Sequence, residues 1–294
     1  MNITLFEGLC VLVILLTLAT MARFSTDERG LRGLLGDYTL LALAGFVGEQ
    51  TSITLYQHYA YAPAWHARVL DVPALVPLIW PLVLLSAREV RTCLFPTARG
   101  LWRAALLGAF VTIDASLMEV LATRAGLWSW SEGGYLDVPI LGILAWGLFA
   151  AAVDGLLDSL RGPARLLVIP GSVVLAHALI CMTWWYGLRW VFRDDFSNLG
   201  MLKMVAFSVL VSLYAWRLRK KRMLPPRVVL PRVAAALVFV ALFLSTAATS
   251  GPHWLHLIAI AVPYCLLTDW RALGAFFSRR SRGVAGDGAA KDPA

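Results

Sequence analysis

Charged residues are scarce in this chain. Only 15% of its 294 residues are Asp, Glu, Lys or Arg, whereas soluble proteins carry about 25%. Hydrophobic residues make up 59% of the chain, and the mean hydropathy is +0.71. A soluble domain of this length cannot hide so much apolar surface. The composition therefore predicts a polytopic membrane protein.

Patterns that bind metals or nucleotides are missing too. The four cysteines have neither zinc-type nor disulfide-type spacing: Cys10, Cys93, Cys181 and Cys265. The chain has no H-x-x-x-H or D-D-x-x-D pattern and no G-x-G-x-x-G, Walker or G-x-S-x-G motif. We therefore expect no metal and no cofactor. The net charge of +8 is expected to set topology rather than to bind nucleic acid.

Nine apolar segments are long enough to cross ~30 Å of hydrocarbon as helices. They span 3–22, 34–56, 72–87, 101–121, 138–158, 166–186, 200–216, 231–249 and 255–274. Because the third is short and the last is weakly apolar, the expected number of helices is seven to nine. The predicted fold is all-α: one transmembrane helical bundle over 1–276, followed by a disordered cytoplasmic tail over 277–294.

The basic residues predict an orientation. With nine crossings, all but five of the 26 lysines and arginines fall on the face that holds the C-terminal tail; the five are Arg68, Arg124, Arg189, Arg193 and Lys203. Positive residues mark the cytoplasmic side of a membrane protein. We therefore expect the protein to lie in the cytoplasmic (inner) membrane, with its N-terminus outside and its C-terminus in the cytoplasm.

One phrase occurs twice. The pattern L-D-V-P-x-L-x-x-L-x-W covers 70–80 and recurs 66 residues later over 136–146. Each copy follows an aromatic-rich loop, and before each loop lies an apolar segment that contains an acid, Glu49 in the first and Asp114 in the second. We interpret the two copies as a duplicated helical hairpin, with units at about 34–87 and 101–158.

The predicted topology brings these acids to the outer end of the bundle, where aromatic residues also gather. An ionisable group at membrane depth costs ~2.5–3.5 kcal/mol to insert, so it usually has a partner or a task. Glu49, Asp114 and Glu119 are therefore the candidate catalytic acids, although neighbouring Ser, Thr or Gln residues could simply satisfy them. The candidate substrate-binding aromatics, each of which could instead be an interfacial anchor, are Tyr59, Tyr61, Trp128, Trp130 and Tyr135.

The remaining candidates have more modest expected roles. Asp71 and Asp137 precede proline by two residues at the predicted start of a helix, which favours helix capping. Trp80 and Trp146 lie nine residues deeper, as packing or substrate-binding residues. His177 lies midway along the sixth segment, where it either packs by hydrogen bonds or contacts substrate.

Two stretches resemble a known family. The run Glu49…Tyr59-Ala60-Tyr61…Asp71-Val72-Pro73…Trp80 and the run Asp114…Glu119…Trp128-Ser129-Trp130…Asp137-Val138-Pro139…Trp146 are similar to signatures of the integral-membrane carotenoid biosynthesis proteins. That family includes the bisanhydrobacterioruberin and carotenoid 1,2-hydratases. The chain departs from its pattern at Asp137, where the family has Gly, and at Gly142 or Ile143, where it has Asn.

The resemblance implies an enzyme, a lyase that hydrates the terminal alkene of a carotenoid or other isoprenoid without a cofactor. Asp114, or else Glu49, would protonate the alkene, aromatic faces would stabilise the cation, and the other carboxylate would activate water. A lycopene-cyclase-like activity is an alternative, although that family's P-x-E-E motif is absent. A lipid transporter and a noncatalytic subunit that binds other pathway enzymes also remain open. In each case membrane lipid surrounds the protein.

Overall fold

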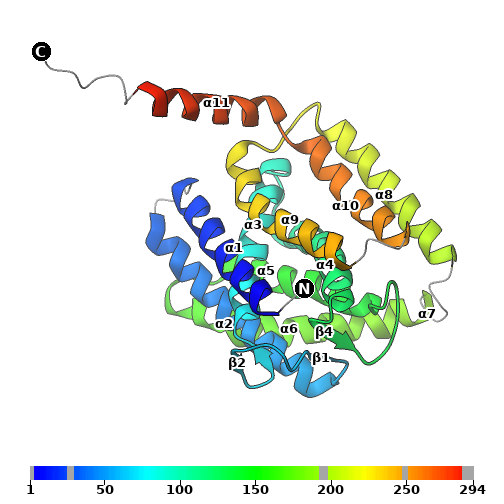
Figure 1. Ribbon diagram of the computed structural model, residues 1–294. Coiled ribbons are helices and arrows are strands. Elements are labelled where there is room, and N and C mark those ends of the chain that lie inside the picture. The colour runs from blue at the N-terminus through cyan, green and yellow to red at the C-terminus, as the bar shows by residue number, and fades with distance from the viewer. Residues whose placement is uncertain (1–2, 25–29, 192–197, 247–250, 287–294) are drawn as a thin grey trace, which may run out of the picture.

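The computed structural model describes residues 3–24, 30–191, 198–246 and 251–286 (Figure 1). Its helices are α1 (Ile3–Phe24), α2 (Gly30–Tyr56), α3 (Leu75–Leu94), α4 (Gly100–Arg124), α5 (Ile140–Ser159), α6 (Val168–Thr183), α7 (Arg189–Val191), α8 (Asn198–Leu218), α9 (Pro226–Thr246), α10 (Gly251–Leu267) and α11 (Trp270–Gly286). The short elements are strands β1 (Tyr59–Tyr61), β2 (Arg68–Val69), β3 (Val72–Pro73) and β4 (Trp128–Trp130), the 3-10 helix η1 (Gly162–Leu167) and the π-helix η2 (Trp184–Leu188).

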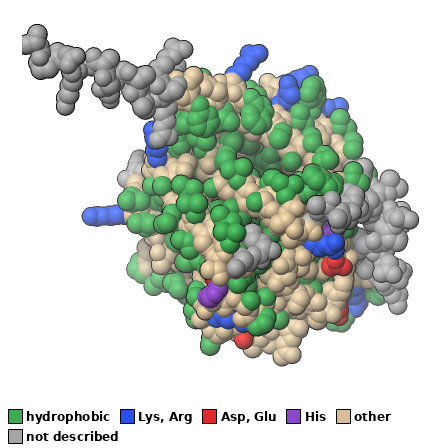
Figure 2. All heavy atoms as spheres, in the orientation of Figure 1, with side chains coloured by type: hydrophobic (Ala, Val, Ile, Leu, Met, Phe, Trp, Pro, Cys, Tyr) green, Lys and Arg blue, Asp and Glu red, His purple; other side chains and the backbone are tan. Residues whose placement is uncertain are grey.

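The molecule is an all-α polytopic bundle. Eight of the nine predicted segments each overlap one of the helices α1 to α6, α8 and α9, whereas the ninth, 255–274, contains the end of α10 and the start of α11. Within the described residues, six helices are long and apolar enough to span a membrane: α1, α2, α4, α5, α9 and the segment Gly162–Gly187 that contains α6. Many large apolar side chains are exposed, and in Figure 2 they cover much of the visible face. Such a surface suits a hydrocarbon environment.

Helices α2 to α6 form the part of the bundle that carries the site. Helix α2 packs against α3 and α6, and α5 packs against α4 and α6. Helices α1 and α9 pack together beside α3, and α8 pairs with α10. The short strands lie at the opposite end of the molecule from α11 (Figure 1).

The aromatic loops form strands, which the sequence did not predict. Strand β1 follows α2 and pairs antiparallel with β4, which follows α4; Tyr59 faces Trp130, Ala60 faces Ser129, and Tyr61 faces Trp128. The pairing ties the loop of the hairpin α2–α3 to the loop of the hairpin α4–α5. Two segments that are about 70 residues apart in the chain thus form one structural unit.

The predicted capping role of Asp71 and Asp137 is wrong. Helix α3 starts after Ala74 and α5 after Pro139, and neither N-cap residue makes a side-chain cap hydrogen bond. The Leu-Asp-Val-Pro phrase forms a turn instead, because Leu70, Leu136 and Asp137 adopt left-handed backbone angles with φ of 55°, 51° and 69°. The carboxyl group of Asp71 accepts a hydrogen bond from Gln50 Nε2 at 2.8 Å.

The predicted disorder of the tail from residue 277 is also wrong over its first part. Helix α11 continues to Gly286, and residues 287–294 lie outside the described part. The sequence Trp270-Arg271-Ala272-Leu273-Gly274-Ala275-Phe276-Phe277 continues as an amphipathic pattern. That periodicity accounts for a helix where composition alone indicated a polar tail.

Buried ion pairs hold the end of the bundle that is distant from the strands. Asp154 in α5, whose side chain is 1% exposed, lies 2.5 Å from Arg91 Nη1, 3.4 Å from Arg103 Nε and 3.5 Å from Arg88 Nε. Arg165 Nη2 lies 2.6 Å from Asp37 Oδ1. These pairs connect α3, α4 and α5 to one another, and α2 to η1.

Helices α4 and α5 approach most closely at two glycines. A Cβ atom on Gly147 would lie 2.0 Å from Thr112 Oγ1 and 2.6 Å from the carbonyl oxygen of Gly108. Small residues at such crossings let two helix backbones approach inside a membrane. No larger side chain fits there unless the helices move apart.

We predict that Gly147→Ala lowers the thermal unfolding temperature in detergent, because the added methyl group forces α4 and α5 apart at a cost of about 1–3 kcal/mol. Gly155→Ala is the matched control, since a Cβ atom on that glycine of the same helix meets nothing within 4 Å. Equal unfolding temperatures for the two variants would contradict the close crossing.

Candidate functional site

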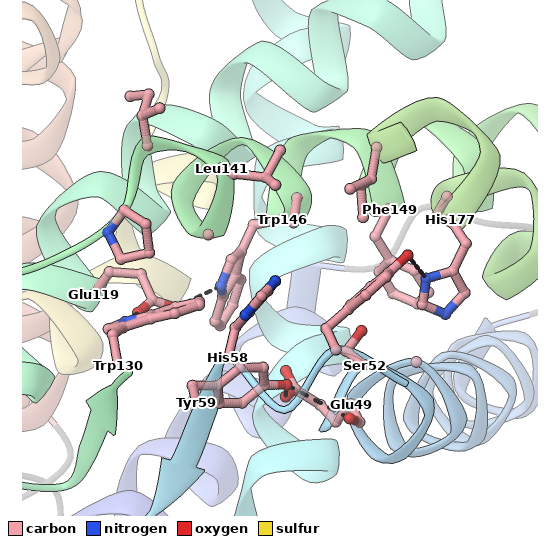
Figure 3. Close-up of a pocket in the computed structure, with 18 of the residues that line it drawn as sticks. Glu49, Ser52, His58, Tyr59, Glu119, Trp130, Leu141, Trp146, Phe149 and His177 are labelled. Atoms are coloured by element: carbon pink, nitrogen blue, oxygen red, sulfur yellow. Dashed lines mark hydrogen bonds between the residues drawn. The ribbon is translucent and has the colours of Figure 1, made fainter. Parts of the chain in front are cut away.

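A cavity of about 1060 Å³ lies between α2, α5, α6 and the paired strands. This volume is at the upper end of the range for small-molecule sites, ~300–1,000 Å³. Figure 3 shows Glu49, Tyr59, Glu119 and Trp130 toward one side of the cavity and His177 toward the other. Two of the three predicted catalytic acids, Glu49 and Glu119, line this cavity.

Three aromatic side chains hold Glu49. Its Oε2 atom accepts hydrogen bonds from the Tyr59 hydroxyl at 2.5 Å and the Tyr61 hydroxyl at 2.9 Å, and its Oε1 atom accepts one from Trp80 Nε1 at 2.9 Å. The glutamate is buried, with 8% exposure. We call this group the Glu49 cage.

Three tryptophans hold Glu119 in the same way. Trp128 Nε1 and Trp130 Nε1 donate to its Oε2 atom at 2.9 and 3.2 Å, and Trp146 Nε1 donates to Oε1 at 2.7 Å. Glu119 is 3% exposed. In this group, the Glu119 cage, all three partners can only donate, because an indole nitrogen has no free lone pair to accept a hydrogen bond.

The two cages share their walls. Each aromatic partner of Glu49 packs against a partner of Glu119, and the ring centroids are 4.9 Å apart for Tyr59–Trp130, 5.7 Å for Tyr61–Trp128 and 4.0 Å for Trp80–Trp146. The last pair is stacked, with an interplanar angle of 24°. The cages therefore form one continuous aromatic wall, which holds the carboxyl groups of Glu49 and Glu119 at two separate positions.

The local sequence explains the cages. Alternate residues of a strand point to the same side, so Y-x-Y and W-x-W each aim two donors at one acid, and β1–β4 pairing brings the two sets together. Glycines leave room for the rings, since a Cβ atom on Gly142 would lie 2.4 Å from the Trp130 ring and one on Gly45 would lie 2.9 Å from Trp80.

The tyrosines of the Glu49 cage keep their protons. Burial, reinforced by the neighbouring carboxyl of Glu49, raises the pKa of Tyr59 and of Tyr61 well above the ordinary phenol value. Both hydroxyls therefore remain able to donate to Glu49. A hydroxyl can also accept a hydrogen bond, which separates the chemistry of this cage from that of the Glu119 cage.

The third predicted acid, Asp114, lies elsewhere. Its Oδ2 atom is 2.6 Å from Arg232 Nη2, and its Oδ1 atom accepts a hydrogen bond from the Tyr264 hydroxyl at 2.8 Å. Glu119, rather than Asp114, is thus the counterpart of Glu49. Glu119 is five positions after Asp114, which is a rotation of about 140° around the helix, so the two acids have different surroundings.

The other predicted residues divide between the cavity and its surroundings. Trp80, Trp146, Asp137 and His177 line the cavity. Tyr135 lies apart from it, with its hydroxyl 3.4 Å from His256 Nδ1.

His177, a candidate from the sequence, belongs to a second polar group in the cavity. The other members of this group were not predicted. The Nδ1 atom of His177 is 2.7 Å from the Tyr56 hydroxyl, and its Nε2 atom is 3.1 Å from Thr51 Oγ1. Ser52, Tyr56 and His58 line the same cavity. The spacing of Ser52 and Tyr56, three and seven residues after Glu49, was the available signal, because these positions share a helix face.

We predict that Asp114→Asn destabilises the protein by roughly 3 kcal/mol, because it leaves Arg232 with its charge uncompensated inside the bundle. The double variant Asp114→Asn with Arg232→Met removes that charge and is expected to recover most of the loss. Thermal unfolding in detergent measures both. A single variant as stable as the parent protein would refute a structural role for this pair.

The comparisons with known proteins identify a family. The family model described as "Carotenoid biosynthesis protein" matches residues 9–196, which is more than half of the chain. No curated protein and no solved structure matches. The matched segment contains both cages and every residue that lines the cavity. The match confirms the resemblance seen in the sequence: the chain belongs to the carotenoid biosynthesis protein family and acts in carotenoid metabolism.

Proposed function

We propose that the protein is a membrane enzyme, a lyase that adds water to a terminal alkene of a carotenoid or related isoprenoid without a cofactor. The observation that carries the proposal is a pair of buried carboxyl groups, Glu49 and Glu119, in one aromatic-lined cavity. Acid-catalysed hydration needs a proton donor, a stabilised cation and a base that activates water. The two cages supply groups suited to each of these tasks.

The surroundings of the cavity suit two different reactants. Its lining includes Cys181 of α6 and Trp185 of η2, which are both exposed on the apolar segment Gly162–Gly187. In the loop after β4 its lining includes Glu132 and Asp137, which are exposed among polar residues. An apolar chain would enter from lipid between α2 and α6, and water would come from the polar end.

The proton donor in this proposal is Glu49. Its tyrosine partners accept as well as donate, so a protonated Glu49 keeps its hydrogen bonds by donating to a tyrosine oxygen. The three donor-only tryptophans around Glu119 suit an ionised carboxylate, which accepts on both oxygens. Asp114, which the sequence favoured as the acid, is bound to Arg232 and takes no part.

The reaction balances as follows. The Glu49 proton moves to one alkene carbon as the π bond breaks, and the other carbon becomes a tertiary cation. The negative faces of the aromatic rings stabilise that cation. Water forms the new C–O bond and gives one proton to Glu119. The product is a tertiary alcohol. Glu119 then releases its proton to solvent and Glu49 takes one up, which restores both groups.

We further propose that the arginine-rich end of the bundle faces the cytoplasm, with the cages toward the outer face of the inner membrane. All nine apolar helices would then cross, and 1–276 would form a single domain. The matching cages support the view that α2–α3 and α4–α5 are a duplicated hairpin, with Glu119 rather than Asp114 as the second acid.

We predict that Glu49→Gln and Glu119→Gln each lower hydrated product at least 100-fold, because each removes an essential proton donor or base. The assay is expression in a host that accumulates acyclic carotenoids, followed by liquid chromatography and mass spectrometry for a product heavier by one water.

Two further variants serve as controls. Glu89→Gln changes an exposed acid of α3 and is expected to leave the yield unchanged. Asp114→Asn should retain its activity per folded molecule. Complete loss of activity in this variant would instead assign the role of proton donor to Asp114. Products of unchanged mass but altered retention in the wild type, with no hydrated product beside them, would indicate cyclisation instead.

We also predict that Trp146→Phe slows turnover about tenfold, because the ring remains but Glu119 loses its shortest hydrogen bond, the 2.7 Å contact with Nε1. Trp102→Phe, on the exposed face of α4, is the matched control. An unchanged rate for Trp146→Phe would show that the reaction does not depend on the hydrogen bond from Trp146 to Glu119.

A further inference from the structure

One face of α2 carries a row of polar side chains into the cavity. Glu49, Ser52 and Tyr56 are spaced at i, i+3 and i+7, so they share that face, and all three line the cavity. At 1.5 Å per residue, Tyr56 lies about 10 Å along the helix from Glu49. Figure 3 shows Ser52 between Glu49 and His177.

The hydrogen bonds around His177 set the direction in which Tyr56 donates. Thr51 Oγ1 lies 2.7 Å from the carbonyl oxygen of Val47, so its single proton is used there. It therefore accepts from His177 Nε2–H at 3.1 Å, which leaves Nδ1 without a proton. The Tyr56 hydroxyl donates to Nδ1 at 2.7 Å. Its oxygen has two lone pairs, so it can still accept a hydrogen bond beside its contact with Cys181.

The rest of this part of the cavity is apolar. Opposite the row lie Phe149 of α5 and Val173 and Ile180 of α6. At the outer end of the row, His58 is exposed and stacks on Tyr56 with ring centroids 6.0 Å apart and an interplanar angle of 9°. The row thus runs from an exposed polar residue to a buried carboxyl group along an otherwise apolar wall.

We infer that the face of α2 formed by Tyr56, Ser52 and Glu49 is a water path, which admits water from the His58 end to the shared wall of the two cages, where Glu119 activates it. This water path rests on the proposed hydration, and Tyr56 and Ser52 are its water-positioning residues. A water bound here would donate to Tyr56 Oη and exchange hydrogen bonds with the Ser52 hydroxyl, both within one or two helix turns of Glu49. Water needs two to four such polar partners to occupy a site of this kind.

This path determines which product forms. The tertiary cation either gains water, which forms a C–O bond and releases a proton, or loses a proton from a neighbouring carbon to a base, which forms an alkene isomer. The first product is heavier than the substrate by one water, and the second has the same mass. Blocking the water path should divert the cation to the second product without stopping protonation.

The first test measures this partition in Ser52→Val and Tyr56→Phe. We expect the ratio of hydrated product to isomer of unchanged mass to fall about tenfold in each, while total conversion stays near the wild-type value. Thr54→Val, which removes an exposed hydroxyl from another face of α2, should leave the ratio unchanged. If both products fall together, or if neither changes, the row only supports the fold and the inference is wrong.

The second test does not depend on turnover. Radiolytic hydroxyl-radical labelling with mass spectrometry marks side chains next to bound water in the purified protein. We expect Tyr59, beside Glu49, to be labelled in the wild type and in Thr54→Val, and labelling to fall at least threefold in Ser52→Val. Equal labelling in Ser52→Val overturns the water path.

The two tests separate the inference from the proposed function. A wild type that forms no hydrated product but shows the expected labelling would refute the hydratase and keep the water path. A Tyr56→Phe variant that keeps its product ratio but raises KM for hydroxylated substrates alone would mean that Tyr56 binds a substrate hydroxyl, which also overturns the inference.

Discussion

Burial of two carboxyl groups among neutral hydrogen-bond donors is the constraint on which the site depends. A carboxyl group at membrane depth is costly unless each oxygen is satisfied. Glu49 and Glu119 each accept three hydrogen bonds from aromatic side chains, so the ring that binds the acid also forms the apolar wall of the cavity. Substituting one ring would therefore change both the orientation of an acid and the shape of the pocket.

The paired strands make this arrangement possible. Helices alone would separate the two hairpin loops, but β1–β4 pairing aligns Tyr59 with Trp130 and Tyr61 with Trp128, and the stack of Trp80 on Trp146 closes the deeper side. Glycines at 45 and 142 make space for two of these rings. Four chain segments are thus fixed relative to one another by contacts between the rings that bind the two acids. Short strands can therefore organise a helical membrane protein.

The sequence predicted the membrane class, the all-α bundle and most residues of the cages, because hydropathy and the L-D-V-P and W-x-W patterns are local signals. It paired Glu49 with Asp114 because their spacing nearly equals the offset of the repeated phrase, 65 against 66 residues. The choice between Asp114 and Glu119 depends on helix rotation and on Arg232, which is more than 100 residues away. The pairing of β1 with β4 is likewise a tertiary contact that no local pattern records.

The partners of the acids separate structural carboxyl groups from reactive ones. Asp37, Asp114, Asp154 and Asp158 each bind an arginine, and these ion pairs join one helix to another. Among the described residues, neither Glu49 nor Glu119 has a basic partner within salt-bridge distance; hydroxyl and indole groups take that place. A carboxyl group without a fixed counter-charge can lose and regain a proton at lower cost, because its partners remain neutral in both states. Proton transfer to an alkene requires that reversibility, which supports the roles proposed for the two glutamates.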